Sequence, residues 1–72
     1  MPIHEAFEEW KAAHDAYIAA ERKLADAETV YAFTQGEAPD QLRSEVAIRR
    51  READRLLARA LQELRSHAAA AR

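Results

Sequence analysis

The chain has 72 residues, a formal net charge of −2, one glycine, two prolines and no cysteine. A chain of this length forms at most one small domain, and without cysteine it has neither disulfides nor thiolate metal sites. A charge near zero provides no general attraction to nucleic acid or to anionic membranes. With no signal-peptide pattern and no apolar run of about 20 residues, the sequence predicts a soluble cytoplasmic protein.

A first helix is predicted over residues 2–34. Pro2 suits the first turn of a helix, because the N–H that proline lacks would have no partner there. Glu5 and Glu8 place negative charge near the positive end of the helix dipole. No helix breaker follows before Thr34, so the helix extends over roughly 48 Å at a rise of 1.5 Å per residue.

A short loop is predicted at residues 35–38, followed by a second helix over residues 39–68. Gly36 can adopt the left-handed conformation that ends a helix. Pro39 cannot continue the first helix but fits the first turn of the next. Asp40 adds favourable charge to that turn or caps it. A connection this short makes the two helices antiparallel neighbours.

A heptad repeat in the first helix is the strongest pattern in the chain. One column is large: Ile3, Trp10, Tyr17, Leu24 and Tyr31. A second column is small: Ala6, Ala13, Ala20, Ala27 and Thr34. These columns are the a and d positions of a left-handed supercoiled seam, in which large and small layers interdigitate. Phe7 and His14 follow the d position and widen the apolar stripe. Glu21 and Glu28 continue the same column.

The second helix is apolar over a wider arc. Its apolar positions are Leu42, Val46, Ala53, Leu56, Leu57, Ala60, Leu61 and Leu64. The smaller residues Val46, Ala53 and Ala60 recur every seven residues, and leucines lie on both sides of them. A lone hairpin cannot cover both flanks, and chains this short rarely have a sufficient core. We therefore predict an all-α antiparallel hairpin that dimerises into a four-helix bundle, with these residues, the first-helix seam and Phe7 as the dimer core.

The two helices carry opposite charge. The first has seven acidic and three basic residues. The second, counted to the end of the chain, has eight arginines against five acidic residues. Complementary helices favour alternating neighbours in a bundle. Folding the chain about residue 37 brings Arg49 near Glu21 and Glu28.

This layered hairpin resembles the ROP-type bundle, a dimer of helical hairpins. The resemblance covers the topology and the core pattern but no motif. In that family the RNA-facing surface lies on the first helices and includes basic groups. Here the first helix is acidic, so the resemblance implies no RNA-binding function.

A basic stripe follows the second helix at Arg51, Arg55 and Arg59. Arginines spaced by four residues on one helix face are typical of a phosphate-contacting surface. Glu52 and Asp54 interrupt this stripe, however, and carboxylates among arginines favour an ion-paired surface instead. We expect the ion-paired surface and keep phosphate contact as the alternative.

One constellation could hold a metal: His4, Glu8, Glu63 and His67. Each His and Glu pair is four residues apart on one helix, and an antiparallel hairpin brings the two pairs to the same end. The Glu-x-x-His spacing of di-iron bundles is absent. His67 also suits the negative end of a helix dipole without any metal. We expect no bound metal and no cofactor.

No residue set indicates catalysis. His14 lacks a second histidine, cysteine or serine at a defined spacing, so the sequence predicts a non-enzymatic protein. Trp10 and Tyr17 are expected in the core. Ile18 and Phe33 fall outside the seam, where they are either ordinary exposed apolar residues or a partner surface.

The predicted function is a homo-oligomerisation or adaptor module that binds itself and another helical protein. One alternative is a small nucleic-acid-associated regulator that uses the arginines of the second helix. Another is metal binding at the open end of the hairpin. The excess of alanine and arginine over isoleucine and lysine is typical of a GC-rich bacterial genome.

Overall fold

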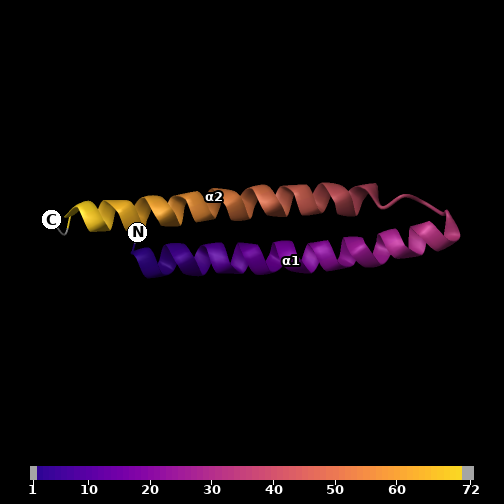
Figure 1. Ribbon diagram of the computed structural model, residues 1–72, viewed down its shortest axis with the longest axis horizontal. Coiled ribbons are helices and arrows are strands. Elements are labelled where there is room, and N and C mark those ends of the chain that lie inside the picture. The colour runs from indigo at the N-terminus through magenta and orange to yellow at the C-terminus, as the bar shows by residue number, and fades with distance from the viewer. Residues whose placement is uncertain (1, 71–72) are drawn as a thin grey trace.

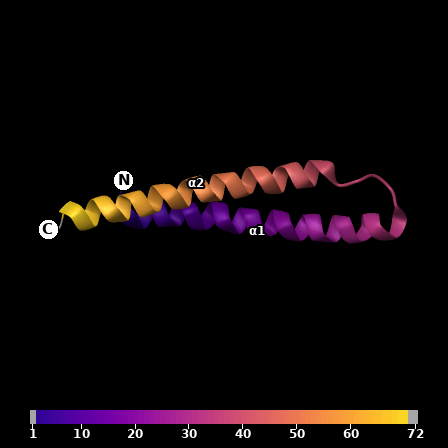
Figure 2. The same ribbon diagram turned by 45° about the horizontal axis from the view of Figure 1, so that its top comes forward.

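The computed structural model describes residues 2–70 as two long helices joined by a short loop. Helix α1 comprises Ile3–Thr34 and helix α2 comprises Asp40–Ala70. The helices run antiparallel and side by side, with both ends of the chain at one end and the loop at the other (Figures 1 and 2). The hairpin measures 60 × 14 × 13 Å. The predicted helical hairpin is therefore confirmed.

Helix α1 starts one residue later than predicted. Pro2 is extended, with φ −62° and ψ 144°, and precedes the helix. Its carbonyl accepts the first helical hydrogen bond from the N–H of Ala6, at 3.1 Å. Pro2 therefore flanks the helix without interrupting its hydrogen-bond ladder.

Helix α1 ends on Gln35 and not on Gly36, so the predicted glycine cap is wrong by one residue. Gln35 is left-handed, with φ 51°, while Gly36 has no positive φ. The N–H of Gln35 donates to the carbonyl of Tyr31 at 2.7 Å. The Thr34 hydroxyl donates to the carbonyl of Val30 at 2.9 Å and accepts from the N–H of Gly36 at 3.4 Å. These bonds reverse the chain one residue before the glycine.

Helix α2 starts one residue later and ends two residues later than predicted. The carbonyl of Pro39 accepts from the N–H of Arg43 at 3.0 Å, so Pro39 flanks the helix and Asp40 is its first residue. At the other end the helix continues through Ala69 to Ala70, because alanine has the highest helix propensity.

The contact between the helices is formed mainly by alanine. Among the described residues, the buried side chains are Ala6, Ala20, Ala53, Leu56 and Ala60. Ala6 and Ala20 belong to the small column of α1, and Ala53 and Ala60 belong to that of α2. The rest of the predicted core is mostly half-buried: Ile3, Phe7, Trp10, Ala13, Tyr17, Leu24, Ala27, Leu42, Val46 and Leu57. A single hairpin thus has very little fully enclosed apolar volume.

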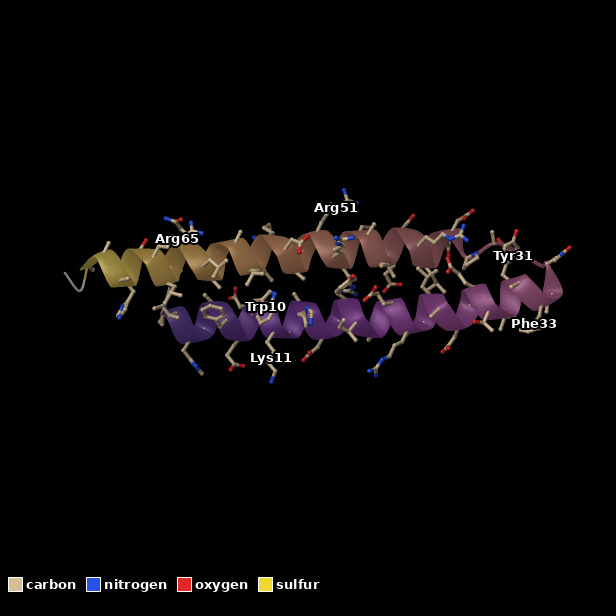
Figure 3. All side chains as sticks on the ribbon, viewed as in Figure 1. Trp10, Lys11, Tyr31, Phe33, Arg51 and Arg65 are labelled. Atoms are coloured by element: carbon tan, nitrogen blue, oxygen red, sulfur yellow. The ribbon has the colours of Figure 1, made fainter. Side chains whose placement is uncertain are left out.

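Three predicted core residues are exposed in the hairpin. Tyr31, Leu61 and Leu64 are 36%, 37% and 44% exposed, respectively. Tyr31 lies close to the loop, where α2 has only just begun (Figure 3). The two leucines lie on a flank of α2 that α1 does not reach. These residues are predicted for the core of a dimer, so their place in that core stays a prediction.

Candidate functional site

Two ion pairs between the helices define the two lateral faces of the hairpin. Arg43 Nε lies 3.0 Å from Glu28 Oε1, and Arg59 Nη1 lies 3.7 Å from Glu9 Oε2. In the α1 heptad, Glu28 follows a d position and Glu9 precedes an a position, so they lie on opposite sides of the seam. One pair therefore marks each lateral face.

The face marked by Glu28 and Arg43 is regular along its whole length. In antiparallel helices, a step of seven residues back along α1 matches a step of seven residues forward along α2. Starting from Glu28 and Arg43, these steps match Glu21 with Arg50, His14 with Leu57, and Phe7 with Leu64. We call the surface made by these eight residues, together with the adjoining Trp10, Tyr17, Ile18 and Leu61, the open face.

The half of the open face farthest from the loop is apolar and aromatic. The rings of Phe7 and Trp10 meet edge to face at 6.5 Å, and those of Trp10 and His14 stack at 5.3 Å with 29° between their planes. His14 in turn lies 6.2 Å from the ring of Tyr17. Figure 3 shows Trp10 on the side of α1 that is turned toward α2. These four rings form one continuous strip along α1.

Leucines of α2 lie beside this aromatic strip. Leu57 is half-buried, while Leu64 is exposed and Leu61, one turn away, is exposed as well. Solvent therefore reaches apolar side chains that the strip does not cover. Exposed apolar side chains that gather on one surface make it a candidate interaction site.

The half of the open face nearest the loop is charged. Hydrogen bonding to Glu28 raises the pKa of Arg43. Partial burial, followed by hydrogen bonding to Glu21, raises the pKa of Tyr17, and the positive charge of Arg50 opposes this rise. Glu21 and Arg50 thus lie near the same tyrosine, yet no ion pair joins them in the described part of the chain.

The lateral face marked by Glu9 and Arg59 is polar. Stepping by seven residues from that pair adds Ala16 and Lys23 on α1, and Glu52 and Glu45 on α2. None of these six positions carries a large apolar side chain. The next step from Lys23 reaches Val30, which is 60% exposed, so this face is polar except at its loop end.

The α1 column of the open face is visible in the sequence, but its counterpart in α2 becomes clear only once the register is known. The signal is the seven-residue spacing of Arg43, Arg50, Leu57 and Leu64. Two basic residues precede two apolar ones, which reverses the order in α1. That reversal is what an antiparallel partner requires.

Two arginines of the candidate phosphate-binding stripe are paired with carboxylates. Arg55 donates to both oxygens of Glu52, at 2.6 and 3.1 Å. Arg59 is paired with Glu9. The third, Arg51, donates to its own helix, at the carbonyl of Ala47, and points away from α1 (Figure 3). Phosphate would have to compete with a carboxylate at two of the three positions.

Arg49 does not lie against the acidic column of α1, so that expectation is wrong. Its Nε lies 3.9 Å from Glu45, within the same helix. Arg43 takes the predicted place against Glu28. Arg49 belongs to the seven-residue column of Leu42 and Leu56, whereas Arg43 is on the flank of α2 that adjoins the acidic column.

The four candidate metal ligands do not converge. In the described residues, no group of three or more histidine, aspartate or glutamate side chains is placed to hold a metal ion. His4, Glu8 and His67 are exposed, and Glu63 is half-buried. The side of α1 that meets α2 is the one with Ala6 and not the one with Glu8, so the two pairs do not face each other.

Ile18 and Phe33 lie on separate parts of α1. Ile18 is half-buried beside the aromatic strip, whereas Phe33 is 86% exposed and points away from α2 (Figure 3). They lie about 22 Å apart along α1 at 1.5 Å per residue. Ile18 widens the apolar half of the open face, and Phe33 belongs to the outer surface near the loop.

Neither helix is long and apolar enough to cross a membrane, within residues 2–70. Comparison with models of known protein families, with curated proteins and with solved structures finds nothing that matches this chain.

Proposed function

We propose that the chain is a non-enzymatic self-association module that pairs with a second copy of itself and presents the resulting bundle to another helical protein. One observation carries this proposal. The hairpin buries only five side chains among the described residues, while the apolar half of its open face remains exposed at Leu61 and Leu64.

Energetics favour covering this surface. Full burial of a leucine side chain contributes about 1.5–3 kcal/mol relative to full exposure. Four of the five buried side chains are alanines, which contribute much less apolar area. Domains this small usually need a second subunit, a metal or disulfides. The chain has no cysteine, so a second subunit is the simplest source of a larger core.

The adaptor role is assigned to the outer surface near the loop. Phe33 and Val30 are three residues apart on α1 and share one helix face. Both are among the exposed large apolar residues. They lie away from the open face, so a bundle formed through that face leaves them free to contact another helix.

The test is sedimentation equilibrium at micromolar concentration. We expect a mass twice that of the 8.2 kDa chain. Replacing Leu61 and Leu64 with lysine should shift the protein toward the single-chain mass, because two charges would be buried against apolar partners. A matched control replaces the exposed Gln62 and Ser66 with lysine and should remain dimeric. A stable, cooperatively folded species of 8.2 kDa would overturn the proposal.

A further inference from the structure

We infer that two hairpins dock open face on open face with both loops at the same end, related by a two-fold axis parallel to the helices. This inference rests on the proposed self-association and adds the interface and its orientation. It follows from how apolar and charged residues are distributed along the open face and between the two helices.

Apolar and charged residues follow a definite order along the open face. Its two levels farthest from the loop are apolar or aromatic, and its two levels nearest the loop pair a glutamate with an arginine. A two-fold axis parallel to the helices leaves each level at the same height. Apolar levels then meet apolar levels, and charged levels meet charged levels.

The charged levels of the open face have glutamate on α1 and arginine on α2. Rotation about that axis places α1 of one chain over α2 of the other. Glu21 then faces Arg50 of the partner subunit, and Glu28 faces Arg43 of the partner subunit. Neither Glu21 nor Arg50 forms an ion pair within the described chain; Glu21 accepts a hydrogen bond from Tyr17, and its carboxylate can also pair with an arginine across the interface. Charge complementarity of this kind fixes the orientation of an interface.

Helix direction is compatible with this arrangement and with its reverse, so it does not choose between them. Each helix has two neighbours in the resulting four-helix bundle, one from each chain, and both run antiparallel to it. The macrodipoles of neighbouring helices are then opposed, which is the favourable arrangement.

The reverse arrangement places the loops at opposite ends and is unfavourable. Its two-fold axis runs across the hairpin, so α1 lies over α1 of the partner subunit with the levels reversed. Glu28 would then face Phe7 of the partner subunit, and Arg43 would face Leu64 of the partner subunit. Burying charges against apolar side chains has a high desolvation cost without a compensating ion pair.

The other lateral face does not offer a second interface of the same kind. Apart from Val30 at the loop end, the positions that run along it from the Glu9–Arg59 pair carry no large apolar side chain. Each copy therefore uses one surface that is complementary to itself. Such an interface closes after two chains and does not propagate into a filament.

The test is a distance measurement between spin labels in the dimer. The chain has no cysteine, so Glu37→Cys provides a single labelling site at the tip of the loop. With the loops together, the two labels should lie on the order of 20–30 Å apart, since adjacent bundle helices pack about 8–10 Å apart. With the loops at opposite ends, the distance should approach the 60 Å length of the hairpin.

A second label at Ala19→Cys is the matched control. Ala19 is exposed and lies midway along α1, so it gives a short distance in either arrangement. Short distances at both sites support the inference. A short distance at Ala19 with a long one at Glu37 overturns the inference and leaves self-association intact. No intermolecular signal at either site, in folded protein, overturns both and assigns the open face to a different partner.

Discussion

At the scale of single residues, the hairpin depends on side chains that are small. Ala6 and Ala20 of α1, with Ala53 and Ala60 of α2, are almost fully enclosed. An alanine at each point of closest approach lets the two backbones come together, and the larger residues of the next layer fill the space between. Adding volume at these positions must therefore push the helices apart.

Replacing Ala20 or Ala13 with leucine should destabilise the protein by roughly 1–3 kcal/mol, because an overpacked contact forces strained rotamers or a backbone shift. The same change at Ala19 or Ala12, which are exposed, should be nearly silent. Thermal unfolding of the four variants measures the difference. Equal effects in the two pairs would show that the seam has been assigned to the wrong columns.

The turn shows where residue-level prediction fails. Glycine adopts positive φ without steric cost, so conformational preference alone predicts the left-handed helix cap at Gly36. The cap is Gln35 instead, where the backbone bond to Tyr31 and the Thr34 hydroxyl fix the chain reversal. Preference for a conformation is local, but the position of a cap depends on the hydrogen bonds that neighbouring groups complete.

At the scale of the helices, the seam was predictable and the open face only in part. Seven-residue spacing identifies the alanine columns of both helices, because residues seven apart lie on nearly the same line along a helix surface. The levels of the open face depend on how α1 and α2 are aligned. That alignment follows from the loop length and the Glu28–Arg43 pair, and neither can be read from one helix alone.

The arginines of α2 give a prediction at this scale. Arg55 and Arg59 are neutralised by Glu52 and Glu9, so we expect no specific binding to nucleic acid and only weak association at low salt. A titration of labelled RNA and duplex DNA at about 50 and 200 mM salt measures this, because each phosphate contact releases a counterion and steepens the salt dependence.

The control for that titration is the triple replacement of Arg51, Arg55 and Arg59 by alanine. It should bind as weakly as the unaltered chain at the higher salt. Sub-micromolar binding at the higher salt that is lost in the triple variant would contradict the adaptor proposal and favour a nucleic-acid-associated regulator.

At the scale of the whole molecule, the hairpin is long and thin. It is 60 Å long and no more than 14 Å across, and each helix packs against a single neighbour within the chain. An elongated pair of helices has a large surface for its volume, so it encloses little apolar area. Stacking two open faces gives every helix a second neighbour and encloses the aromatic strip.

The most direct test of this account is an isotope-filtered NOE spectrum of a mixture of labelled and unlabelled chains. It detects proton contacts between chains and ignores contacts within one chain. The account predicts cross-peaks from the rings of Phe7 and Trp10 in one copy to the methyl groups of Leu61 and Leu64 in the other. A folded chain that gives no cross-peaks between copies, at a concentration where its spectrum is well dispersed, would contradict it.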